Sequence, residues 1–340
     1  MMRVSKQAEN GTTRRGLLQG AALGGAGIAA ASLLPAPTAS AAGASGGFVF
    51  PGVDIVIDGS HATTDVTLLV RDYLARKSAA DPDGTMTFFS HNPVTYIDAV
   101  LGWSWYDWDS LRTALGQFMP NWPKDGKSYP TRILGNSAGA IVFFTDTAGL
   151  FGSSEIRAVG VINFSDRKIT RQIDYWDGRH FGISDTAKLR VPADTFPADF
   201  RESTVGETAA HTMKNASYTL ARALRAGDGA SAADLFAPGA VFEDIPAHVQ
   251  IVGPRSIGSY LTGAASLLPY SGGSTAVRHV VGSAAGGGYE WTASDGPVPR
   301  GVIALELDGW GKITRLTAMW DGSQVDDSTL VSLSQKAIER

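Results

Sequence analysis

One short motif occurs twice in this chain. Lys168-Ile169-Thr170-Arg171 leads on to Trp176-Asp177-Gly178, and Lys312-Ile313-Thr314-Arg315 leads on to Trp320-Asp321-Gly322. Each copy is a β-branched and aromatic run with a turn before it and Asp-Gly after it, which is typical of the last strand of an antiparallel sheet. The two copies have the same internal spacing. Because the two copies lie in different halves of the chain, their repetition predicts two structural units of the same kind.

The residue alternation of each closing strand predicts which side chains share a face. Side chains of a strand point alternately to its two sides, so Gln172, Asp174 and Trp176 should lie together. The corresponding residues of the second copy are Leu316, Ala318 and Trp320. We therefore expect a more polar face in the first unit than in the second.

The rest of the sequence repeats one order of elements: a helix, a short helix, a strand, a helix and then strands. In the first half these elements are predicted at Val66–Leu74, Met86–Phe89, Val94–Asp98, from Asp109 to Pro120, Thr131–Thr145, Ile156–Phe164 and Ile169–Asp177. In the second half they are predicted at Glu207–Ala226, Ala232–Phe236, Ala240–Asp244, Ser256–Leu268, Val277–Thr292, Gly301–Leu307 and Ile313–Asp321. Helices followed by antiparallel strands predict an α+β fold. We expect two tandem cone-shaped units, each a curved antiparallel sheet wrapped on helices.

Composition shifts give the domain boundaries. We predict a signal peptide at 1–41, a flexible lead-in at 42–62, the first domain at 63–182, a linker at 183–206, the second domain at 207–328 and a tail at 329–340. A hydrophobic content of 44% and a charged content of 18% are ordinary for a globular protein. A net charge of −4 gives no electrostatic reason to expect a nucleic-acid partner. The chain has no cysteine, so disulfides and thiolate metal sites are excluded.

The amino terminus has the pattern of an export signal. Arg14-Arg15 forms a twin-arginine motif, an apolar stretch follows from Ala21 to Leu34, and Ala39-Ser40-Ala41 offers a cleavage site. The apolar stretch is short and rich in glycine, so we expect no stable membrane anchor. The sequence predicts a protein secreted by the twin-arginine pathway.

The stretch Phe236-Ala237-Pro238-Gly239-Ala240-Val241-Phe242-Glu243-Asp244 resembles the corresponding part of ketosteroid isomerases and SnoaL-like polyketide cyclases. These enzymes belong to the nuclear transport factor 2-like superfamily. Both closing strands, with their Trp-Asp-Gly, resemble the last strand of that family, and the resemblance covers nearly all of the mature chain as two copies. It implies a pocket for a hydrophobic, polyketide- or steroid-like small molecule. It also implies isomerisation, cyclisation or dehydration by general acid–base catalysis without a cofactor.

The resemblance also implies roles for individual residues. Asp98 matches the catalytic general base, Tyr73 matches the oxyanion-hole tyrosine, and Trp176 matches an aromatic residue that lines the pocket. In the second copy Asp244 and Trp320 match, whereas the tyrosine position is Leu220. The second acid of the isomerases should fall near Val159, where this chain has no acidic residue.

The residues themselves allow the same chemistry. A carboxylate in an apolar pocket has a raised pKa, so Asp98 could transfer protons near neutral pH. Asp174 could supply a second acid from the same strand face as Trp176. Trp103 and Trp105 could stack on a flat ligand at the pocket mouth. Each residue also has a structural alternative: Asp98 could only bond to its own turn, and Tyr73, Trp103 and Trp105 could be ordinary core residues. The alternative for the whole protein is that it binds a small molecule without catalysis.

A second motif favours a different reaction. Gly135-Asn136-Ser137-Ala138-Gly139 has the G-x-S-x-G pattern of serine hydrolases, which requires a strand before the serine and a helix after it. The strand-like residues that follow predict a bend or bulge within the sheet instead, so a hydrolase using Ser137 is a minor alternative. The six histidines are scattered, and we expect no metal site. An intramolecular pseudo-dimer and a homodimer both remain open.

Overall fold

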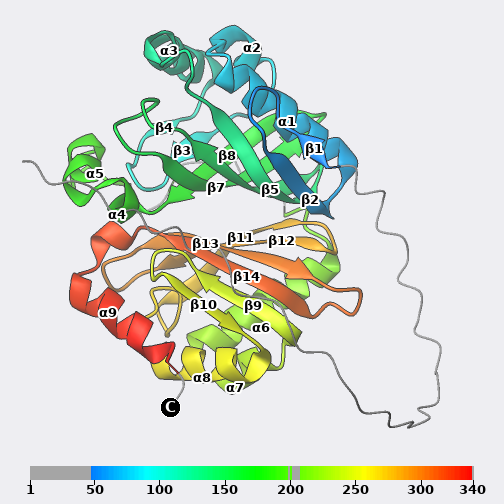
Figure 1. Ribbon diagram of the computed structural model, residues 1–340, viewed down its shortest axis with the longest axis vertical. Helices are drawn as coiled ribbons and strands as arrows, with labels where there is room; N and C mark the ends of the chain where they lie inside the picture. Colours follow the sequence, from blue (N-terminus) through cyan, green and yellow to red (C-terminus); the bar gives the residue numbers. More distant parts are fainter. Residues whose placement is uncertain (1–46, 198–199, 201–206, 339–340) are drawn as a thin grey trace, which may run out of the picture. The chain divides into compact units, whose positions relative to one another are not determined.

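The structure is a computed structural model that describes residues 47–197, 200 and 207–338. These residues form two separate sheets with helices, so the α+β prediction is confirmed (Figure 1). The strand order of the first sheet is β1-β2-β5-β6-β7-β8-β3-β4, and that of the second is β10-β9-β14-β13-β12-β11. The predicted signal peptide lies outside the described residues.

The first half of the chain contains the eight-stranded sheet. Its strands are β1 (Phe48–Val49), β2 (Val56–Ala62), β3 (Tyr96–Asp98), β4 (Ser104–Trp105), β5 (Ser128–Asn136), β6 (Gly139–Asp146), β7 (Ile156–Ser165) and β8 (Lys168–Trp176). Its helices are α1 (Thr64–Ser78), α2 (Pro82–Met86), α3 (Trp108–Phe118), the 3₁₀ turn η1 (Met119–Asn121), α4 (Gly178–Phe181) and α5 (Ile183–Leu189).

The second half contains the six-stranded sheet. Its strands are β9 (Phe236–Asp244), β10 (Val249–Val252), β11 (Thr275–Gly282), β12 (Gly286–Ala293), β13 (Arg300–Leu307) and β14 (Ile313–Trp320). Its helices are α6 (His211–Arg225), α7 (Gly229–Ala233), α8 (Pro254–Ala264), the 3₁₀ turn η2 (Gly322–Gln324) and α9 (Asp327–Lys336).

Four features of the fold differ from the sequence expectation. The segment expected to be a flexible lead-in contains β1 and β2, and β2 pairs in parallel with β5. The predicted strands 131–145 and 277–292 are each two antiparallel strands joined by a hairpin. Helix α5 lies within the predicted linker, and α9 extends into the predicted tail. The sheets are mixed, because β3 and β9 each pair in parallel with the closing strand of their own half.

Helix α1 forms where the apolar spacing predicted it. Val66, Val70, Tyr73 and Leu74 are buried on one face of the helix. The helix begins at Thr64, with Thr63 at the N-cap, and no side chain caps it. Its buried face continues one turn further than predicted, to Lys77.

Strand β8 has a different environment on each face, as its alternation predicted. Gln172, Asp174 and Trp176 are buried on the side of the first unit's helices, and Asp174 and Trp176 line a cavity there. Ile173 and Tyr175 point to the other side, into an apolar cluster that includes Val302 of the second sheet. One strand therefore contributes to a candidate site and to the contact between the sheets.

Polar bonds reinforce this contact between the sheets. Arg171 Nη2 lies 2.5 Å from Glu290 Oε2, and Tyr175 donates to Glu290 Oε1 at 2.5 Å. The two Trp-Asp-Gly turns bond to each other reciprocally: Gly178 N donates to Asp321 at 3.2 Å, and Gly322 N donates to Asp177 at 3.1 Å. The repeated motif thus supplies matching halves of a single contact.

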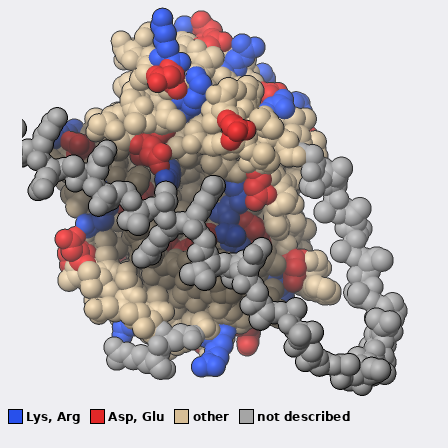
Figure 2. Space-filling view, in the orientation of Figure 1, with Lys and Arg blue, Asp and Glu red and all other residues tan. Residues whose placement is uncertain are grey.

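The surface of the described residues carries both signs of charge. In the view of Figure 2, Lys and Arg side chains lie beside Asp and Glu rather than in one large patch of a single sign. None of the helices in the described part of the chain combines the length and the hydropathy that a membrane crossing would need.

Candidate active site

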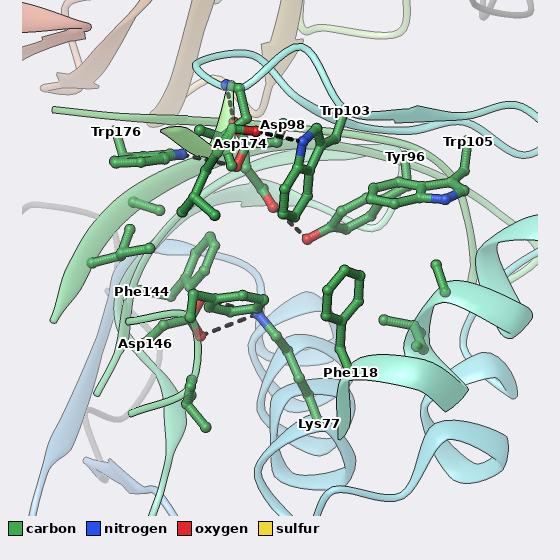
Figure 3. A pocket seen from close by; sticks show the side chains of 18 of the residues that line it. Lys77, Tyr96, Asp98, Trp103, Trp105, Phe118, Phe144, Asp146, Asp174 and Trp176 are labelled. Carbon is green, nitrogen blue, oxygen red and sulfur yellow. Dashed lines mark hydrogen bonds and ion pairs between the residues drawn. The ribbon is translucent and has the colours of Figure 1, made fainter. Parts of the chain in front are cut away.

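The first unit contains a mainly apolar cavity of about 200 Å³. Aromatic side chains from β4, α3 and β8 form much of its wall, and the polar groups that line it include Lys77, Tyr96, Asp98, Asp146 and Asp174 (Figure 3). An apolar cavity with a few convergent polar groups is the usual form of a small-molecule site.

Asp98 lies at the end of β3 and points into this cavity. Its Oδ1 accepts bonds from Val100 N at 2.9 Å and Leu101 N at 2.8 Å, and its Oδ2 accepts one from Trp176 Nε1 at 2.9 Å. Burial disfavours the charged carboxylate and raises the pKa of Asp98 to about 7, although these three bonds oppose the rise. Near neutral pH this carboxyl group is present in both protonation states, as a general acid–base catalyst requires.

Asp174 is the neighbour of Asp98 across the β3–β8 pair. Tyr96 OH donates to its Oδ2 at 2.7 Å, and Gln172 Nε2 donates to its Oδ1 at 3.0 Å. Burial raises the pKa of Asp174 to about 6, while the charge of Lys77 acts in the opposite direction. The predicted placement of Asp174 beside Asp98 and Trp176 is therefore what the structure shows.

Tyr73 does not lie where the family resemblance implied. It is buried between Phe88 and Phe89, with ring centroids 5.9 Å and 5.6 Å away, and it is not among the residues that line the cavity. The side chains that donate to Asp174 are those of Tyr96 and Gln172 instead. The tyrosine on the cavity wall is Tyr96, two residues before Asp98 and hence on the same face of β3.

The predicted aromatic residues do line the cavity. Trp103 stacks on Phe118 with centroids 5.7 Å apart, meets Trp105 edge-on at 6.3 Å, and donates from Nε1 to Leu189 O. Trp176 forms the wall beside Asp98. These rings leave flat apolar surface facing the cavity, which suits a ring-containing ligand.

Sequence reasoning missed Lys77 and Asp146, a buried ion pair on the cavity wall. Lys77 Nζ lies 3.1 Å from Oδ1 and 3.2 Å from Oδ2 of Asp146. The signals were present: Lys77 follows Tyr73 at the i+4 position of the buried helix face, and Asp146 shares a strand face with Phe144. The second signal was hidden because β5 and β6 were predicted as one strand.

The second unit repeats the Asp–Trp bond without the cavity. Trp320 Nε1 donates to Asp244 at 3.0 Å, and Tyr270 OH donates to it at 2.6 Å. Burial raises the pKa of Asp244 to about 6. Asp244 is itself 1% exposed, and it borders an open depression of about 290 Å³ whose lining residues include Asp177 and His248. Trp320 is not among the residues that line this depression, and its wall lacks the tryptophans of the first unit's cavity.

Ser137 lies in the hairpin between β5 and β6, and its hydroxyl bonds to Asp65. The prediction of a bend or bulge is wrong in detail, because the motif is the turn between two strands. Strand β6 follows the serine where a nucleophile elbow needs a helix. The geometry of this motif gives a serine hydrolase no support.

No cluster of three His, Asp or Glu side chains suited to a metal ion occurs within the described ranges. The polar groups of the cavity are instead paired with one another, as carboxylate with phenol, indole or ammonium.

Comparisons with known proteins agree with the resemblance seen in the sequence. No protein-family model and no curated protein matches this chain. Similar solved structures include a steroid delta-isomerase from Pseudomonas aeruginosa, with 16% identity, 39% of this chain and 93% of that chain covered, and a TM-score of 0.30. A protein from Shewanella putrefaciens described as a SnoaL-like polyketide cyclase has 14% identity, coverages of 38% and 88%, and a TM-score of 0.31.

A third similar structure, from Catenulispora acidiphila, has a ketosteroid isomerase-like fold and was solved with trimethylamine; its identity is 14%, its coverages 38% and 97%, and its TM-score 0.30. Each of these matches spans little more than a third of this chain and most of its own. Similarity at this level concerns fold and assigns no reaction.

Replacing Trp176 by Phe tests the electrostatics of Asp98. The indole N–H bond favours the ionised carboxylate, so its loss should raise the pKa of Asp98 further. A charge-assisted bond of this kind corresponds to roughly one pH unit. We expect the pH midpoint of ligand-proton exchange, or of Asp98 titration by NMR, to move upward in Trp176→Phe. The matched change Trp320→Phe in the second unit should leave it in place, and a midpoint that stays or falls in Trp176→Phe would contradict this account.

Proposed function

We propose that the first unit is an acid–base enzyme acting on a hydrophobic small molecule of polyketide- or steroid-like character. The proposed reaction is an isomerisation, cyclisation or dehydration that needs no cofactor. The observation that carries this proposal is the Asp98 carboxyl group, which lines an apolar cavity with its pKa raised to about 7. A strand-end aspartate in water would be fully ionised at that pH and a weak base.

The arrangement assigns a role to each group. Asp98 in its ionised form removes a proton from carbon beside a ligand carbonyl, and the electron pair moves to that carbonyl oxygen. Protonated Asp174 is an O–H donor on the same wall and stabilises the developing charge on that oxygen, while the O–H of Tyr96 bonds to Asp174 and holds its carboxyl group in place. Return of the proton from Asp98 to another carbon gives isomerisation, and departure of a hydroxyl group gives dehydration. The aromatic wall orients the ligand and excludes water.

The test is proton exchange at the carbon next to a ketone in a bicyclic probe, compared between wild type and Asp98→Asn. Exchange that depends on Asp98 supports the enzyme. A wild-type protein that binds the probe and does not accelerate its exchange contradicts the enzyme.

A non-catalytic binding protein is the second candidate, and the second unit favours it. Asp244 and Trp320 make the same bond as Asp98 and Trp176, although the depression beside Asp244 is not lined by Trp320 and lacks the aromatic wall of the first unit's cavity. The Asp–Trp bond therefore has a structural use independent of catalysis. In that case the cavity would bind its ligand unchanged, and Asp98 would only hold the Val100–Leu101 turn.

We further propose that the protein is exported by the twin-arginine pathway, on the basis of Arg14-Arg15 and the apolar stretch that follows them. The paired change Arg14→Lys and Arg15→Lys should retain the protein in the cytoplasm of a bacterium with this pathway. Fractionation and immunoblotting measure the distribution, and an unchanged secreted fraction would contradict the proposal.

A further inference from the structure

We infer that the Lys77–Asp146 pair is a second polar subsite of the cavity, and that it binds a carbonyl oxygen on an otherwise apolar ligand. This inference deepens the proposed function, since it rests on the cavity accepting a small molecule. It does not depend on whether Asp98 transfers a proton.

The first argument is the position of the pair. Lys77 is 3% exposed and Asp146 is 5% exposed, yet both border the cavity. Burying an ion pair costs several kcal/mol of desolvation per ion, which mutual attraction seldom exceeds by much. A hydrophobic pair would close this wall at least as stably, so stability alone does not account for charges here.

The second argument is the bonding capacity of the ammonium group. An ammonium has three N–H donors, and the two oxygens of Asp146 accept two hydrogen bonds from it. The same nitrogen lies 5.0 Å from the centroid of Phe144 and 5.7 Å from that of Phe151, both cavity residues. These rings hold the cation beside apolar surface on which a ligand would lie. Figure 3 shows Lys77 reaching toward the cavity across from Asp174 and Tyr96.

The third argument concerns the charge of the ligand. Asp98, Asp146 and Asp174 all line the cavity, and Lys77 is the cationic side chain among the lining residues. A ligand anion would face three carboxyl groups, and a ligand cation would face the ammonium. A neutral carbonyl accepts a hydrogen bond without adding charge, and the apolar wall accommodates the rest of such a molecule.

The experiment compares two ligands that differ in one oxygen, 1-tetralone and its hydrocarbon counterpart tetralin. Binding is measured at pH 9 by quenching of tryptophan fluorescence. At that pH Asp98 and Asp174, with pKa values of about 7 and 6, have lost their protons and cannot donate to the ketone. We expect the affinity ratio of ketone to hydrocarbon to fall by roughly tenfold in the double variant Lys77→Met with Asp146→Leu, which removes both charges together and leaves no N–H donor at either position.

Trp122 supplies the control, because it lines the same cavity and its Nε1 is a buried donor for which the described residues provide no partner. Trp122→Phe should keep the wild-type ratio. An affinity ratio that is unchanged in the double variant, or lost only in Trp122→Phe, overturns the inference.

The wild-type protein alone provides a second test. If it prefers the ketone at pH 5 but not at pH 9, the donor is a carboxyl group and the inference is wrong. Asp98→Asn should retain the preference, so failure of the proposed reaction and failure of this subsite give different results.

Discussion

Asp98→Asn is expected to slow proton exchange of a bound ketone by about 10²- to 10⁴-fold, the usual contribution of a positioned general base. The asparagine retains an acceptor for the Val100 and Leu101 amides but has no lone pair basic enough to remove a carbon-bound proton. The measurement is deuterium incorporation next to the carbonyl of 2-tetralone in D₂O, followed by NMR. Wild-type exchange should be greatest between about pH 6 and pH 7, because it needs ionised Asp98, with a pKa of about 7, and protonated Asp174, with a pKa of about 6.

The matched control for this prediction is Asp244→Asn. Asp244 also accepts a bond from a tryptophan and has a pKa raised to about 6, yet it borders an open depression and not the aromatic cavity of the first unit. The variant Asp244→Asn should therefore leave the rate of proton exchange unchanged. Probe affinity close to that of wild type would show that Asp98→Asn preserves the cavity. Equal exchange in wild type and Asp98→Asn would contradict the enzyme assignment.

Arg171→Met is expected to lower the free energy of unfolding by about 3–5 kcal/mol, because it leaves a buried charge without its partner. The side chains of Arg171 and Glu290 are 1% and 0% exposed, and Nη2 lies 2.5 Å from Oε2. Arg171 also holds the pKa of Glu290 below its usual range against the effect of burial. Urea denaturation monitored by circular dichroism measures the change.

The repeated motif provides a matched control in Arg315, the same arginine in the second Lys-Ile-Thr-Arg. Its partner is Glu243 at 2.7 Å, but the two side chains are 35% and 21% exposed. Solvent screening limits such a pair to about 1 kcal/mol or less, so Arg315→Met should have a small effect. Similar losses in the two variants would show that burial does not govern these pairs. The double change Arg171→Met with Glu290→Met should recover most of the lost stability.

The site was only partly predictable from the sequence. The family resemblance pointed to Asp98 and Trp176, strand alternation added Asp174, and Trp103 and Trp105 were expected to stack on a flat ligand at the pocket mouth; in the structure all five residues line one cavity. Tyr73 and Tyr96 show the limit of that reasoning. Both are tyrosines at the correct period for an inward face, but the rings of Phe88 and Phe89 enclose Tyr73 while Tyr96 borders the cavity.

The hairpins and the ion pair show a second limit. The segments 131–145 and 277–292 were each predicted as one strand although each contains a glycine-rich stretch, which is where the chain reverses. Gly135 and Gly282 adopt φ values of +128° and +121°, which most other residues avoid. Once β5 and β6 were merged, the position of Asp146 opposite Lys77 could not be read from the sequence.

The sequence by itself determined the repeat, the α+β class and the two faces of each closing strand, since these follow from local periodicity and spacing. The tertiary structure alone decided which member of each repeated pair is buried and which faces a cavity. Asp98 with Asp244, and Arg171 with Arg315, are equivalent in sequence and differ in environment. The physical reason is that desolvation and ion pairing depend on what packs against a residue from distant parts of the chain, and no local pattern records that.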